Sequence, residues 1–225
     1  MKSVHRRGTA IMLAIAAGMS LVAASACSGG APQRDAQPER VAEGREVWYF
    51  DSLEKMAATA ELVVVAEVAK VEPGRWIGSK DGGDRDQARN VTLKVENVLR
   101  STGGAVTSTV QLDEWGWDAK GHGYQFAGVT WTNQGDRGIY FLVPVADAPG
   151  QWRLVNSQGR VLIRTASAKT GSVAALDSSA ETHDALSVKI ESLTVEGLIR
   201  LTKEADQAVQ EGRLQPLDKP KLIGG

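Results

Sequence analysis

Hydrophobic side chains recur along this chain with two periods, which predict helices near both ends and strands between them. In residues 53–60 the apolar positions lie three or four apart, as on one face of a helix. Asp51 and Glu54 have the spacing of a capping box, so we expect this helix to begin after Asp51. Residues 182–191 fit a strand or a helix, and the clear helix over 194–211 favours the second. Two further helices are therefore expected before the C-terminus.

Strand patterns fill the middle of the chain. The predicted strands are residues 62–71, 91–96, 106–117, 139–145, 152–156 and 160–164. The β-branched run 62–71 is expected to end at Pro73-Gly74, and the almost wholly apolar run 139–145 is expected to be a central strand. Ser157-Gln158-Gly159 separates the last two strands and predicts a hairpin. Three polar, glycine-containing segments are predicted as loops: 75–88, 118–137 and 166–180.

This order of elements predicts an α+β fold. We expect a small closed or partly closed antiparallel β-barrel with an N-terminal short helix and C-terminal helices. The succession of Ala60–Val68, Val91–Ser101 and Gly138–Leu142 resembles exported actinobacterial proteins with a netrin-like or OB-like barrel. The resemblance covers residues 50–165. Netrin-like domains usually carry disulfides, whereas this chain has one cysteine. The metalloprotease-inhibiting use of that fold needs a free N-terminal cysteine at the barrel edge, and it does not transfer because a long tether separates Cys27 from the expected barrel.

The first 26 residues have the three parts of an export signal. Lys2, Arg6 and Arg7 form a basic start without an acid, and an uncharged, mostly apolar stretch follows at 8–22. That stretch is shorter than the about 20 residues that a membrane-spanning helix needs. Small residues then lead to Cys27. The pattern therefore predicts a removable leader.

Cys27 indicates the kind of leader. The run Leu21-Val22-Ala23-Ala24-Ser25-Ala26-Cys27 resembles the lipobox of bacterial lipoproteins, although that family usually has leucine where this chain has Ala24. The resemblance implies acylation of Cys27, with palmitate or a similar fatty acid, at the first mature residue. The alternative is ordinary cleavage after Ala26 that leaves a free thiol. A lone cysteine in an exported chain otherwise lacks a partner, which favours the lipoprotein signal peptide.

The expected organisation follows from these patterns. Residues 1–26 are the signal peptide, 27–46 a flexible tether, 47–215 a single globular domain and 216–225 a frayed tail. The chain has 26 basic and 27 acidic residues, and leader removal takes only basic ones. The resulting acidic protein gains nothing from anionic lipid headgroups or nucleic acid. We therefore expect attachment to the extracytoplasmic face of the cell membrane through acyl chains alone.

Motifs of catalysis and cofactor binding are not found in the sequence. It contains no nucleophile elbow, zinc-protease motif or phosphate-binding loop, and we predict no cofactor. His122 has no nucleophile or acid at an assignable spacing, so a solvated loop histidine is the simpler interpretation. Residues 81–86 carry three carboxylates, but their spacing misses the EF-hand pattern and Arg85 opposes a cation. We therefore predict no metal site.

An aromatic cluster is the most suggestive feature. Trp115, Trp117, His122 and Trp131 lie within 17 residues and are the predicted ligand-binding residues, for an envelope glycan or a protein. The alternative is that Trp115 and Trp117, two apart on a strand, share one face and fill the core. The cluster thus predicts either a binding surface or a core plug.

Two functions remain open at this point. The first is a non-catalytic binding domain exposed outside the cell. The second is a hydrolase of envelope polymers that uses Asp113, Glu114 or Asp118 as acid and base, which requires two carboxyl groups about 5–10 Å apart. The absence of a recognisable catalytic spacing favours the first.

Overall fold

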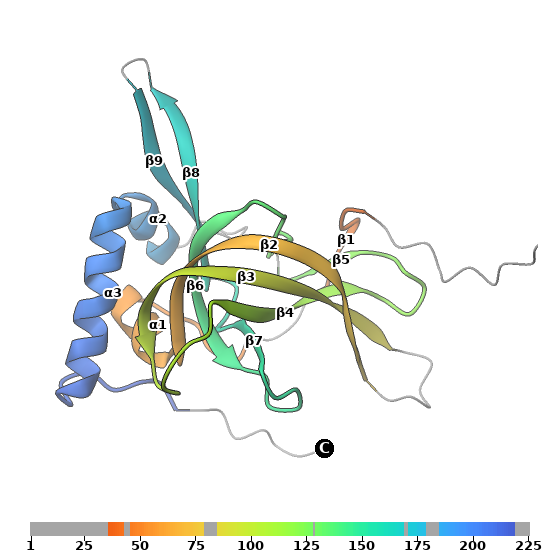
Figure 1. Cartoon of the computed structure of the whole chain (residues 1–225), viewed down its shortest axis with the longest axis horizontal. Coiled ribbons are helices and arrows are strands. Elements are labelled where there is room, and N and C mark those ends of the chain that lie inside the picture. The colour runs from red at the N-terminus through yellow and green to blue at the C-terminus, as the bar shows by residue number, and fades with distance from the viewer. Residues whose placement is uncertain are drawn as a thin grey trace, which may run out of the picture. The chain divides into compact units, whose positions relative to one another are not determined.

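The computed structural model describes residues 36–42, 46–78, 85–127, 129–168, 171–178 and 185–218. Its elements are β1 (Arg40–Ala42), α1 (Leu53–Thr59), β2 (Leu62–Ile77), β3 (Asp86–Ser101), β4 (Thr109–Trp117), β5 (Tyr124–Phe126), β6 (Arg137–Pro144), β7 (Gln151–Leu154), β8 (Arg160–Ala168), β9 (Gly171–Ser178), α2 (Ala185–Glu191) and α3 (Val195–Gln210) (Figure 1). The predicted α+β class, with a mostly antiparallel sheet, is confirmed. No described helix is both long enough and apolar enough to cross a bilayer.

The main sheet has the order β2-β3-β4-β7-β6-β8-β9, and β2 also pairs with β6. The strands β2, β3, β4, β7 and β6 therefore pair in a closed circuit. All of these pairings are antiparallel except that of β4 with β7. The short strands β1 and β5 form a separate parallel pair. Strand β6 contacts β2, β7 and β8, which confirms the prediction of a central strand.

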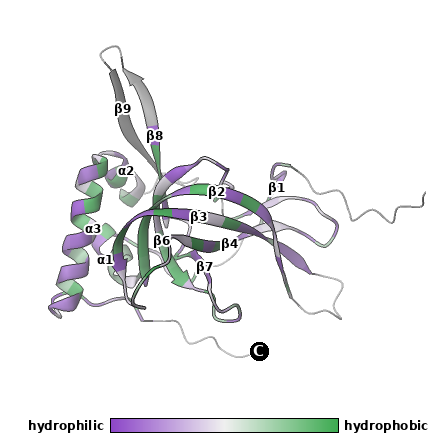
Figure 2. Cartoon of the chain, in the orientation of Figure 1, coloured by the Kyte–Doolittle hydropathy of each residue, from purple (hydrophilic) through white to green (hydrophobic). Residues whose placement is uncertain are grey.

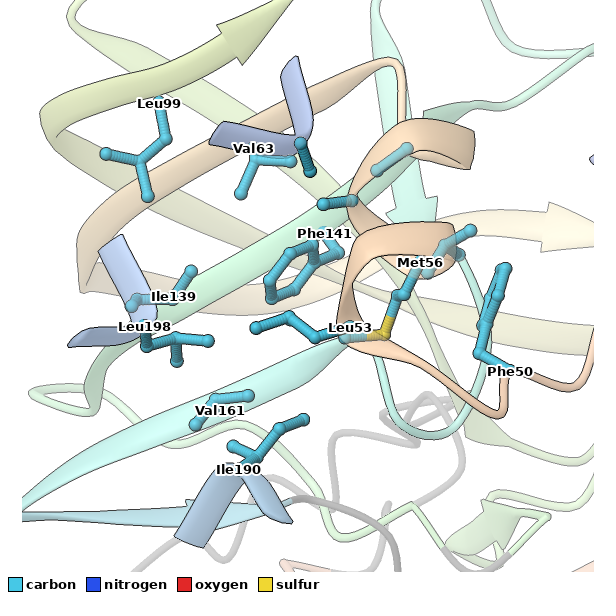
Figure 3. Close-up of a cluster of buried hydrophobic side chains, with 14 of the residues drawn as sticks. Phe50, Leu53, Met56, Val63, Leu99, Ile139, Phe141, Val161, Ile190 and Leu198 are labelled. Carbon is cyan, nitrogen blue, oxygen red and sulfur yellow. The ribbon is translucent and has the colours of Figure 1, made fainter. Parts of the chain in front are cut away.

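Two hydrophobic clusters lie on opposite faces of β2 and β6, because side chains alternate between the faces of a strand. On one face Val63 and Phe141 pack with all three helices. In Figure 3, Phe141, Leu53 and Met56 point toward one another from the sheet and α1. On the other face Val64 packs against residues of β3 and β4 inside the circuit of strands. In Figure 2, α3 is apolar along one side and polar along the other.

The helix boundaries depend on capping residues, and the structure corrects the predicted capping residue of one helix. Helix α1 begins after Ser52, whose Oγ accepts a hydrogen bond from the N–H of Lys55 at 3.2 Å, so the expected cap at Asp51 is wrong by one residue. Thr194 caps α3 as predicted. Gly212 follows α3 with a positive φ of 71°, which glycine adopts without strain.

Strand β2 continues past Pro73-Gly74, where the sequence predicted its end. Its pairing with β6 stops at Glu67, whereas its pairing with β3 continues to Ile77. The edge that faced β6 is thus unpaired at Pro73, and a proline is tolerated there because its missing N–H removes no ladder bond. The predicted loop over 75–88 is correspondingly shorter.

The predicted hairpin around Ser157-Gln158-Gly159 is also wrong. Strands β7 and β8 do not pair with each other, because they pair with consecutive stretches of the same edge of β6, while β2 pairs with its other edge. The expected loop 166–180 instead contains the end of β8 and all of β9, paired over eight residues. Backbone hydrogen bonds form this ladder although the residues are small and polar, which is why side-chain pattern did not indicate it.

The segments expected to be a tether and a frayed tail contain ordered parts. Within the described residues of the tether, Arg40–Ala42 pair with Tyr124–Phe126. Near the other end, the N–H of Leu217 donates to Oγ1 of Thr59 at 3.0 Å. These short stretches pack on the domain because each satisfies main-chain hydrogen bonds there.

Candidate functional site

A cavity of about 290 Å³ lies where β4 and β7 separate. The two strands pair only at Gln111 with Gln151 and at Leu112 with Trp152. Beyond this point both strands border the cavity. Its lining residues are Glu46, Val47, Ile77, Leu112, Asp113, Glu114, Trp115, Phe126, Val129, Trp131, Arg153, Leu154, Val155, Asn156 and Ser157. Most of these side chains are apolar or aromatic, as in ligand pockets generally.

An aromatic pair forms one wall of this cavity. The rings of Trp115 and Phe126 stack with their centroids 5.3 Å apart and their planes at 28°. Both also line a second pocket, whose other residues include Arg40, Asp86 and Asp118. The Trp115–Phe126 pair thus lines an apolar pocket and a charged one.

The charged side chains at the cavity differ in how many hydrogen bonds and ion pairs they make. The side chain of Asp113 is 5% exposed and accepts hydrogen bonds from Nε and Nη2 of Arg75 at 3.1 and 2.9 Å. Arg153 lies farther away, with Nη2 3.6 Å from the same carboxylate, and its side chain is 43% exposed. No hydrogen bond from the Arg153 guanidinium to another described residue is found. Arg153 is therefore the least committed cation at this cavity.

A buried ionic network borders the cavity through Glu114. Its carboxylate pairs with the guanidinium groups of Arg89 and Arg160, and it also accepts hydrogen bonds from the main-chain N–H and Oγ1 of Thr132. Arg160 is fully buried. Burial lowers the pKa of Arg89, while the charge of Glu114 and its hydrogen bond raise it. Two cations thus share one carboxylate that is largely shielded from water.

Gly116 leaves the room that Arg89 requires. A Cβ at this position would lie 2.7 Å from Cγ of Arg89 and 2.7 Å from the carbonyl oxygen of Gln87. A larger residue at Gly116 would therefore force the Arg89 side chain or the backbone of β3 to move. This explains why a glycine interrupts the tryptophan-rich strand β4.

The predicted aromatic cluster divides into core and cavity residues. Trp117 and Trp131 are 8% and 6% exposed and pack edge to face with their centroids 5.4 Å apart. Trp131 also donates through Nε1 to the carbonyl of Tyr124 and lies over the guanidinium of Arg89. Trp115 is only partly buried. The core interpretation therefore describes Trp117, while Trp115 and Trp131 line the cavity.

His122 lines neither pocket, although it contacts Asp118 of the second one. Its Nδ1 is 3.1 Å from Oδ2 of Asp118, a carboxylate that also binds Arg40 and accepts from the N–H of Lys120. Desolvation raises the pKa of Asp118, but the hydrogen bonds from His122, Lys120 and Arg40 outweigh it and hold the pKa well below its ordinary value. Asp118 therefore stays ionised and organises its loop.

The sequence reading missed several residues of the site. Arg153 and Leu154 line the cavity from a segment that carried no motif. The burial of Arg89 could have been predicted, because Arg89 continues the alternation that places Val91 and Leu93 on the inward face of their strand. Arg160 had none, since it begins a strand whose neighbours the pattern misassigned.

Other predicted sites lie partly or wholly beyond the described residues. Cys27 is outside them, as is most of the acidic loop 81–86. Among the described residues, no three His, Cys, Asp or Glu side chains gather to hold a metal ion.

No family model and no curated protein matches this chain. The site is therefore interpreted from its geometry.

Proposed function

We propose that this protein is a membrane-anchored lipoprotein whose folded domain binds a ligand outside the cell without transforming it. The cavity between β4 and β7 carries the proposal, because it combines an apolar lining, the Trp115–Phe126 pair and the half-exposed guanidinium of Arg153, whose ion pair with Asp113 is long at 3.6 Å. Such a combination of apolar walls with a few polar groups is typical of binding sites. The leader and Cys27 support the anchor and the extracytoplasmic location.

Binding is favoured over hydrolysis because the predicted carboxylates are engaged separately. Asp113 and Glu114 are consecutive on β4, so their side chains extend to opposite faces of the strand. Each pairs with arginine. Asp118 has a lowered pKa, whereas a general acid needs a raised one. These three residues therefore do not form a convergent acid and base pair.

The pairing pattern supports a small barrel of the OB-like or netrin-like kind. An OB-type barrel has five strands, mostly antiparallel, in a partly open Greek key. Here β2, β3, β4, β7 and β6 pair in a circuit, and the pairing of β4 with β7 is only two residues long. On this proposal, the cavity is the opening of the barrel.

Replacing Trp115 with alanine tests the binding function. We expect the whole chain, purified in detergent, to bind envelope fractions of the producing cell about tenfold more weakly after this change, because cavity aromatics dominate binding energies. Bound and free protein are separated by sedimentation and quantified. Trp76→Ala is the matched control, because Trp76 is exposed and lines neither pocket. Equal weakening by both substitutions would contradict the proposal.

Replacing Cys27 with alanine tests the anchor. We expect the protein to move from the membrane pellet to the soluble extracytoplasmic fraction, because without acyl chains an acidic chain has no other attachment. Fractionation followed by immunoblotting measures the distribution, and Ser28→Ala is the control that keeps the thiol. Retention of the Cys27→Ala protein in the pellet would contradict lipidation.

A further inference from the structure

We propose that the ligand of this cavity is an extended peptide that pairs with the strand edges exposed between β4 and β7 and places a carboxylate at Arg153. The inference rests on the proposed binding function and names its ligand class. Three observations carry it: the way the strands border the cavity, the hydrogen-bond register of both strands, and the state of Arg153.

The cavity borders the strands along their edges. Its lining includes two runs of consecutive residues. One is 112–115 of β4, and the other is 153–157, at the end of β7 and just after it. Side chains on a strand alternate between two faces, so a cavity against one face contacts every second residue. Contact with every residue in turn means that the cavity meets the edge of the strand, where the main-chain N–H and C=O groups lie.

The register of β4 shows which groups face the cavity. The N–H of Val95 donates to the carbonyl of Ser108 at 2.9 Å, so these residues are a hydrogen-bonded pair of the antiparallel ladder. Bonded and non-bonded pairs alternate along such a ladder. Leu112, four residues after Ser108, therefore directs its N–H and C=O toward β3. Asp113 directs its own groups to the opposite edge, on the side of β7.

The register of the opposite strand is complementary. The N–H of Val155 donates to the carbonyl of Phe141 at 2.9 Å, so Val155 bonds to β6 and the preceding residue, Leu154, directs its N–H and C=O toward β4. Pairing of β4 with β7 ends one rung earlier. The rung from the Leu154 N–H to the Asp113 carbonyl is absent from the described ladder. A donor and acceptors for a further strand thus border the cavity.

Arg153 supplies a recognition charge. Asp113, the nearest carboxylate, already accepts two hydrogen bonds from Arg75, whereas Arg153 lies 3.6 Å away and is 43% exposed. A guanidinium binds a carboxylate through two parallel hydrogen bonds. The carboxylate of the peptide is its C-terminus or an Asp or Glu side chain, which present the same group to Arg153.

A peptide fits these observations better than an acyl chain or a glycan. A fatty acid would also match an apolar cavity with one cation, but it would bury the carbonyl of Asp113 and the N–H of Leu154 without partners, at a cost in free energy. An extended peptide satisfies them as an added strand, a known mode of peptide recognition. Its alternate side chains would contact the apolar wall near Trp115 and Phe126.

Tetrapeptide pools test the ligand class on the whole chain in detergent. One pool has a free C-terminus and no acidic side chain, and a second has a C-terminal amide and one glutamate. We expect binding from at least one pool. Scanning N-methylation along the best peptide is expected to weaken binding about tenfold at alternate positions, because every second N–H of a strand enters the ladder.

Arg153→Gln tests the carboxylate contact. We expect this variant to bind the best peptide about tenfold more weakly and to lose the preference for the carboxylate over its amide derivative. Arg137→Gln is the matched control, because Arg137 is 45% exposed, pairs with Glu96 and does not line the cavity. Its affinity for the peptide is expected to equal that of the unmodified chain.

The outcomes separate this inference from the proposed function. Laurate and chitotriose serve as acyl and glycan probes. Binding of laurate or chitotriose in place of peptides overturns the inference, and so does a uniform sensitivity of peptide binding to N-methylation. The inference also fails if no peptide binds while envelope binding still depends on Trp115. Envelope binding that is independent of Trp115 overturns the proposed function itself.

Discussion

The Glu114→Gln variant is expected to lose about 3–5 kcal/mol of unfolding free energy, the cost of removing one partner from a buried ion pair. Glutamine keeps the shape of the side chain but not its charge, so Arg89 and Arg160 would share a buried space without a counter-ion. For a domain of this size that loss corresponds to a fall of roughly 6–20 °C in the melting temperature.

Urea titration of both chains, followed by circular dichroism, measures the change for Glu114. Glu96→Gln is the matched control, because Glu96 binds Arg137 at the surface, where an ion pair contributes at most about 1 kcal/mol. A loss below about 1 kcal/mol for Glu114→Gln would show that water or another anion compensates the two guanidinium groups.

Phe141→Ala is expected to destabilise the domain by about 3–5 kcal/mol, since it removes a large buried ring and leaves a cavity. Phe141 is fully buried on β6, in the cluster that joins the sheet to the helices. The free energy of unfolding is again obtained from urea titration.

The control for Phe141 is Val188→Ala on α2, at a side chain that is 56% exposed. A surface change of this kind typically alters stability by about 0.5 kcal/mol or less. Similar losses for both variants would mean that the cluster around Phe141 does not hold the helices to the sheet.

Local patterns in the sequence predicted much of the fold. The apolar run around Phe141 indicated a central strand because a strand covered on both faces needs apolar residues on both. Thr194 and Gly212 marked the ends of a helix because helix ends need specific hydrogen-bond partners and backbone angles. Signals of this kind act over a few residues, so they can be recognised in the sequence without knowledge of the fold.

The pairing of strands was harder to predict from the sequence. Gly159 between two β-like runs predicted a hairpin, but β7 and β8 each pair with β6 instead. Strands β7 and β8 run in the same direction, both antiparallel to β6, so the chain does not reverse between them. A local turn signal does not specify which strand edge each of the two runs selects. That choice depends on which surfaces can be buried together, which involves β2 and the helices as well.

The candidate site shows the same division. Trp115 was named from the sequence because an aromatic cluster beside carboxylates is visible locally. The meaning of Glu114 was not, because its partners Arg89 and Arg160 lie 25 and 46 residues away. A carboxylate on an inward-facing strand position is interpretable only once its counter-ions are located.

The sequence by itself determined the α+β class, the ends of α3, the central strand and the expectation of an exported, acylated protein, since these depend on short-range periodicity and on local motifs. Only the tertiary structure decided that β4 and β7 part after Leu112, that Arg153 borders the gap and that Glu114 is held between two arginines. The physical reason is that backbone pairing and charge compensation are satisfied across the whole sheet, by groups that are neighbours in space and distant along the chain.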